Sequence, residues 1–140
     1  MEDTIIARGQ VYAIDMHPEE GITPHEGYSS RRKFFIVLGI DNDGMVYGGV
    51  VFNSKVNTHM PELVQLYQMP IRYEQYPFLT HRSYVDCASL KRIRSTDLVA
   101  IKGEYLGAMT QDDLELIVNT VVSCPLIPKA ELIQFGLSQL

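Results

Sequence analysis

The fold is decided by residues 34–52, which read FFIVLGIDNDGMVYGGVVF. Residues 34–40 are apolar apart from one glycine, as is typical of a strand buried on both faces. Residues 41–44, Asp-Asn-Asp-Gly, form a strong hairpin-turn signal, and residues 45–52 supply the returning strand. Gly48 and Gly49 in that strand predict a bulge or a sharp bend, which small closed barrels need at their corners.

Weaker strand and helix signals lie on either side of this hairpin. Further strands are predicted at residues 10–16, 83–87, 90–93 and 103–108. Residues 61–67 fit either a short helix or a strand, and residues 71–79 are expected to be irregular. A single capped helical turn is predicted at 95–100.

The clearest helix begins after Thr110, with Asp113 three residues later in a capping-box arrangement. Apolar residues then recur at helical spacing and define one buried face: Leu114, Ile117, Val118, Val121 and Val122. Prolines end this helix, and residues 129–137 predict a short terminal helix. Strands followed by a closing helix indicate a small, strongly bent barrel with helical decoration.

Size and charge limit the function classes. A chain of 140 residues suits a single domain spanning residues 1–140. The formal net charge of −5 disfavours general nucleic-acid binding but allows a small cleft of local positive charge. No apolar run is long enough to span a membrane and no signal-peptide pattern is present, so a cytoplasmic location is expected. Cys87 and Cys124 are then expected to be reduced, buried thiols.

Two arginines, Arg31 and Arg32, stand just before the apolar run, after a loop that carries His25 and Glu26. A guanidinium holds an oxyanion with a rigid fork of N–H donors, so this pair suits recognition of a phosphate. The alternative is that paired arginines only solvate an edge strand.

Antiparallel pairing brings the end of the hairpin close to its start, so Asn53 and Ser54 should lie near Arg32. A cation, a hydroxyl and an acid–base group would then share the edge of one cleft. Such a set can cleave RNA without a metal: a base activates the 2′-hydroxyl, cations stabilise the charge on phosphorus oxygens, and an acid protonates the leaving 5′-oxygen.

Each of these residues also has a purely structural interpretation. His25 can be a solvated loop residue, Glu26 can pair with a nearby arginine, and Ser54 can cap a turn. His59 and His81 are assigned no role. No metal and no cofactor is expected, because the histidines form no helical pair and no Cys-x-x-Cys occurs. A nucleophilic Cys87 is disfavoured because the acidic neighbour Asp86 raises the pKa of a thiol.

The order of elements resembles the MazF/PemK/Kid toxin family. The resemblance rests on residues 8–15 (RGQVYAID), on Arg32 before the apolar run, and on residues 103–117 (GEYLGAMTQDDLELI). It implies a mainly β, α+β fold: an SH3-like small barrel with a C-terminal amphipathic helix. It also implies a homodimer, metal-independent cleavage of single-stranded RNA to a cyclic phosphate, and an antitoxin that covers the RNA groove.

Residue by residue, the resemblance implies that Arg32 stabilises the phosphate charge, that Ser54 positions the phosphate or the 2′-hydroxyl, and that His25 or Glu26 shuttles protons. Arg31, Lys33 and Asn53 would bind the RNA. Lys33 stands where the family has a proline, and the family's Arg-x-Asp before a late strand has no arginine here. The segment 57–81 is longer than is typical.

Two rival functions stay open. The first is a non-catalytic SH3-like barrel that binds RNA or a protein, which the acidic net charge favours. The second is a structural or inhibitor-like partner of a mobile element. Product formation from RNA separates catalysis from both.

Overall fold

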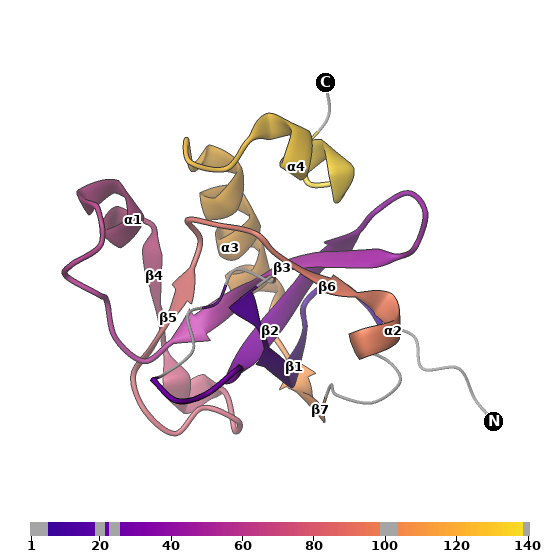
Figure 1. Cartoon of the computed structure of the whole chain (residues 1–140). Coiled ribbons are helices and arrows are strands. Elements are labelled where there is room, and N and C mark those ends of the chain that lie inside the picture. Colours follow the sequence, from indigo (N-terminus) through magenta and orange to yellow (C-terminus); the bar gives the residue numbers. More distant parts are fainter. Residues whose placement is uncertain (1–5, 19–21, 23–25, 99–103, 139–140) are drawn as a thin grey trace.

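The central hairpin forms because its two apolar segments bury both faces against two separate cores. In the computed structural model, which describes residues 6–18, 22, 26–98 and 104–138, it consists of β2 (Arg31–Ile40) and β3 (Val46–Asn53) (Figure 1). The Asp41 carboxylate accepts hydrogen bonds from the backbone N–H groups of Met45 and Val46 and fixes the turn. Gly44 has a φ of 71°, a left-handed conformation that favours glycine.

The sheet is antiparallel, with the order β4-β5-β3-β2-β1-β7 and with β6 also paired to β3. The other strands are β1 (Gln10–Met16), β4 (Gln68–Ile71), β5 (Ser83–Asp86), β6 (Lys91–Arg94) and β7 (Glu104–Ala108). One edge of β3 pairs with β2 over residues 47–51. Its other edge pairs first with β6 and then, beyond Gly49, with β5. Gly48 and Gly49, where a bulge or sharp bend was predicted, lie opposite a register shift between Val37 and Gly39 of β2, and β3 changes partners just beyond them.

The helical segments are α1 (Glu62–Leu66), the 3₁₀ turn η2 (Tyr73–Gln75), α2 (Ser95–Asp97), α3 (Gln111–Ser123) and α4 (Lys129–Gln134). All except α2 add residues to the core on one face of the sheet, whereas Leu98, the C-cap of α2, lies in the core on the other face. The buried residues Leu114, Ile117 and Val121 of α3 join Ile36 and Leu38 of β2 in the larger core. On the other face of β2, Phe35 and Val37 pack in a second core with Leu98. Both faces of β2 are therefore buried, as its continuous apolar sequence predicts.

The helix α4 lies directly on the hairpin, with the ring of Phe135 over Gly48. A Cβ at Gly48 would lie 2.5 Å from Cγ of Phe135, and a Cβ at Gly39 would collide with the Phe135 carbonyl. Arg8 also contacts the hairpin, because its Nε donates to the Leu38 carbonyl oxygen of β2 at 2.7 Å. Glycine at these two positions is what allows α4 to pack so closely.

The start of α3 confirms the predicted cap. The Oγ1 atom of Thr110 accepts a hydrogen bond from the Asp113 backbone N–H at 3.2 Å. The reciprocal half of the capping box is wrong, because the Asp113 carboxylate accepts from the Tyr76 hydroxyl instead. That hydroxyl in turn accepts from the Thr110 backbone N–H, so Tyr76 completes the cap from a distant segment.

Several predicted boundaries change. The strand β2 begins at Arg31, not at residue 34, because its pairing with β1 continues to Met16 opposite Arg31. The segment 61–67 is a helix, and β4 follows it where no strand was predicted, since residues 68–71 pair with β5. Cys87 and Cys124 are both buried and free. No helix of the described segments is long and apolar enough to cross a bilayer.

Candidate functional site

Two adjoining cavities open where β2 begins and β3 ends. The first has a volume of about 410 Å³ and extends toward α1, β4 and Lys91 of β6. The second has a volume of about 350 Å³ and extends toward Phe78 and His81. The residues that line both cavities are Arg31, Lys33, Asn53 and Ser54. These four residues form the wall that the cavities share, and we call them the shared wall.

Alternation along β2 decides which basic side chain reaches which cavity. Arg31 and Lys33 lie on the face of Phe35 and line both cavities, whereas Arg32 lies on the opposite face and lines only the second. Lys33 is 7% exposed, and Arg32 is exposed. Because the strand starts at Arg31, these three positions are held by pairing with β1 and do not belong to a loop.

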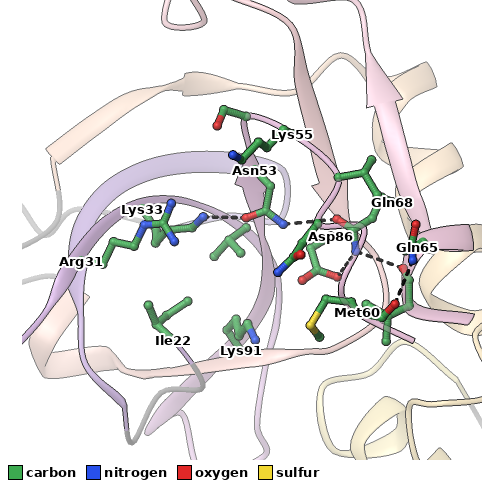
Figure 2. Close-up of a pocket in the computed structure, with 15 residues that line it drawn as sticks. Ile22, Arg31, Lys33, Asn53, Lys55, Met60, Gln65, Gln68, Asp86 and Lys91 are labelled. Atoms are coloured by element: carbon green, nitrogen blue, oxygen red, sulfur yellow. Dashed lines mark hydrogen bonds between the residues drawn. The ribbon is translucent and has the colours of Figure 1, made fainter. Parts of the chain in front are cut away.

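A relay of hydrogen bonds crosses the floor of the first cavity (Figure 2). Nζ of Lys33 donates to Oδ1 of Asn53 at 2.7 Å, and Nδ2 of Asn53 donates to Oε1 of Gln68 at 3.2 Å. Nε2 of Gln68 then donates to Oδ1 of Asp86 at 2.9 Å. The donors all run in one direction, from a cation to a carboxylate, so each amide has a single favourable orientation. The relay ties β2, β3, β4 and β5 together at the site.

Two lysines of the first cavity, Lys33 and Lys91, have a lowered pKa. Burial, and then the neighbouring Arg31, lower the pKa of Lys33 to about 8, with a smaller contribution from Lys91, while Asp86 opposes the shift. Burial also lowers the pKa of Lys91, again against the influence of Asp86. Groups of like charge in a partly dehydrated cavity disfavour one another's charged form, so an anion in this cavity would be stabilised.

Arg32 is engaged by carboxylates on two neighbouring strands. Its Nη2 atom lies 2.7 Å from Oε1 of Glu104 on β7, and its Nη1 atom lies 3.6 Å from Oδ1 of Asp15 on β1. Asp15 is the direct register partner of Arg32, so the contact follows from the pairing of β1 with β2. The pairing of Arg32 with Glu104 could not be predicted, because Glu104 is 72 residues away along the chain.

The residues predicted for the site are brought together only in part. Arg32 and Ser54 both line the second cavity, and Ser54 is exposed. Glu26 is exposed and lines neither of the two cavities. His25 lies outside the described residues. Among the described residues, no group of three or more His, Cys, Asp or Glu side chains could hold a metal ion.

One residue that was assigned no role, His81, also lines the second cavity with Arg32 and Ser54. Its Nδ1 atom lies 3.1 Å from the hydroxyl oxygen of Thr80. The local sequence gives no sign of this position, because His81 reaches the cavity only through the pairing of β5 with the end of β3. Strand pairing between distant segments also brings three residues to the first cavity that were not predicted for the site: Lys91, Gln68 and Asp86.

The arrangement of strands and helices is similar to that in a crystal structure of MazE–MazF from Deinococcus radiodurans. The TM-score is 0.57 at 12% sequence identity, over 86% of this chain and 95% of that one. The chain has a MazF-like fold. No family model and no curated protein sequence matches it. The similarity confirms the predicted fold class, a mainly antiparallel β structure with a C-terminal helix, and at this identity it shows the fold alone.

Proposed function

We propose that this MazF-like chain cleaves single-stranded RNA without a metal, with the scissile phosphate held in the second cavity, beside the shared wall. The observation that carries the proposal is that Arg32 and Ser54 line one cavity, next to Arg31, Lys33 and Asn53. A strand that crosses from one cavity to the other would pass over the shared wall, so that one phosphate lies at Arg32 in the second cavity and the backbone beside it meets Arg31 and Lys33. Phosphates are held by such side chains.

In the proposed reaction the 2′-oxygen attacks the adjacent phosphorus and the bond to the 5′-oxygen breaks, which leaves a 2′,3′-cyclic phosphate and a free 5′-hydroxyl. Arg32 stabilises the charge that develops on the phosphate oxygens, and Ser54 positions the phosphate or the 2′-hydroxyl. Arg31, Lys33 and Asn53 bind the flanking backbone.

One group must take the proton of the 2′-hydroxyl and one must protonate the departing 5′-oxygen. His25 and Glu26 remain proposed carriers from the sequence. His81 is a third, supported by its place in the cavity of Arg32 and Ser54. Imidazole is the group that proteins use most often for such transfers.

The likeness to a MazE–MazF complex also supports proposals about assembly. We propose that this chain forms a homodimer, that an antitoxin-like protein binds it, and that it acts in the cytoplasm. Co-purification of a small protein that blocks RNA binding would support the second of these.

The test uses purified chain and a pool of synthetic single-stranded RNAs in the presence of EDTA. Cleavage products that end in a cyclic phosphate, and their loss in Arg32→Ala and Ser54→Ala, are expected. Lys129→Ala is the matched control, because Lys129 is an exposed cation on α4 that lines neither cavity. A wild-type chain, shown to be free of any bound inhibitor, that leaves every RNA intact would rule the activity out.

A second function, RNA binding without cleavage, is favoured by the ion pairs of Arg32. A guanidinium held by Glu104 and Asp15 has part of its charge neutralised before any phosphate arrives. If this function is correct, substitutions in the shared wall should weaken RNA binding, and no cleavage product should form at any incubation time.

A further inference from the structure

Lys33 is the one charged residue among the buried residues of the described part. Its polar partner is a neutral amide oxygen, that of Asn53, at 2.7 Å. The ion pairs among the described residues join Arg32 to Asp15 and Glu104, and Arg92 to Glu131, so none of them neutralises Lys33. Burial of an ammonium that no carboxylate contacts is unfavourable, and a bound anion would offset this cost.

The surroundings of Lys33 add positive charge. Arg31, Lys55 and Lys91 line the same cavity, and Asp86 is the one carboxylate among the lining residues (Figure 2). Oδ1 of Asp86 already accepts hydrogen bonds from Nε2 of Gln68 and from the Ala88 backbone N–H. Positive charge thus gathers in one cavity of a chain whose formal net charge is −5, and this distribution favours a small anion over a broad polyanionic surface.

We propose that the first cavity is a phosphate subsite in which Lys33 is the buried anchor and Arg31 the second ligand. The Asn53 oxygen takes one of the three ammonium N–H groups, which leaves two for phosphate oxygens. The guanidinium of Arg31 supplies a fork that matches two oxygens of the same phosphate. The relay through Gln68 to Asp86 fixes the Asn53 amide, so the ammonium is held in place before the anion binds.

The source of the phosphate rests on the proposed function. Arg31 and Lys33 belong to the shared wall, so this subsite adjoins the second cavity, where the scissile phosphate would lie. An RNA strand would then place the neighbouring phosphate on Lys33, and the enzyme would require a substrate with a charged linkage beside the cleaved one.

The subsite is tested first with inorganic phosphate alone, by ¹⁵N NMR of the lysine side-chain nitrogens in the wild-type chain. Phosphate, and not chloride at equal ionic strength, is expected to shift the Lys33 signal and to raise the pKa of Lys33. Lys33→Met, which fills the same space without charge, should lower phosphate affinity at least tenfold, whereas Lys129→Met should not change it. An unshifted Lys33 signal at tens of millimolar phosphate would overturn the subsite, and that result does not depend on any variant folding.

A second experiment identifies the source of the phosphate. Non-cleavable 2′-deoxy-substituted RNAs carry one neutral methylphosphonate linkage beside the central one, and their affinities are measured by fluorescence anisotropy. The neutral linkage should weaken binding to the wild type at least fivefold and have little effect on Lys33→Met. Equal losses in both proteins would refute an RNA phosphate on Lys33. Because the first experiment contains no RNA, failure of the proposed function leaves its result intact.

Discussion

Arg32 and Glu104 form an ion pair of 2.7 Å that reaches from β2 across β1 to β7, with the Asp15 carboxylate 3.6 Å from the same guanidinium. The side chains of Arg32 and Glu104 are 49% and 66% exposed, so the pair is open to solvent and can be exchanged for a ligand. An exposed pair of this kind is worth up to about 1 kcal/mol. The ion pair therefore orients the Arg32 guanidinium but leaves it able to bind a phosphate in the proposed reaction.

Removal of the Glu104 charge should strengthen RNA binding. We expect Glu104→Gln to raise the affinity for single-stranded RNA by about two- to fivefold, because the guanidinium no longer has to leave a carboxylate. Fluorescence anisotropy at fixed salt measures the change. Glu131→Gln is the matched control, since it breaks an ion pair with Arg92 that lies outside both cavities. Equal affinities in Glu104→Gln and wild type would show that Arg32 does not contact the RNA.

The buried ammonium of Lys33 should make stability depend on pH. Its pKa is lowered from 10.5 to about 8 in the folded chain, so between these values the unfolded chain binds more protons than the folded one. The free energy of unfolding should therefore rise as the pH increases from about 8 to 10.5. In Lys33→Met this contribution is absent. The stability difference between variant and wild type should change by about 1–2 kcal/mol across that window, less than the full shift would give because solvent screens part of the interaction. Urea titrations at several pH values provide the measurement. Parallel curves for the two proteins would contradict the assignment.

The contact between Gly48 and Phe135 should limit substitution in the hairpin. Gly48→Ala places a Cβ against the Phe135 ring and should destabilise the chain by about 1–3 kcal/mol. Phe135→Leu should also destabilise it, because Phe135 is a fully buried side chain. The double variant should lose less than the sum of the two, since the smaller side chain makes room for the new methyl group. Urea unfolding of the four proteins tests this. Strict additivity would mean that the two positions do not touch.

Cys87 should be chemically inert in the folded chain. Burial, and then the neighbouring Asp86, raise the pKa of its thiol to about 12, so the reactive thiolate is scarce at neutral pH. We expect labelling by a thiol reagent to require unfolding, with a rate that rises steeply in denaturant. Rapid labelling of Cys87 in the native protein, located by mass spectrometry, would be inconsistent with this environment.

The limits of the hairpin and of β1 could be predicted to within a few residues, because apolar runs and the turn at residues 41–44 are local signals. The helix after Thr110 was predicted for the same reason. The strand β4 and the second half of the α3 cap could not be predicted. Residues 68–71 become a strand only by pairing with β5, and the Asp113 carboxylate accepts from the hydroxyl of Tyr76 instead of from the Thr110 backbone N–H.

The sequence by itself determined a mainly β fold and placed basic residues just before its central hairpin, because apolar runs and turn chemistry act between near neighbours. Only the tertiary structure decided which of these residues share a cavity. Lys33 meets Asn53, Gln68 and Asp86 through three strand pairings, while Arg32, one residue earlier, faces the other side of the sheet and meets Glu104. Sheet pairing between distant segments places these side chains together, and no local pattern in the sequence encodes that pairing.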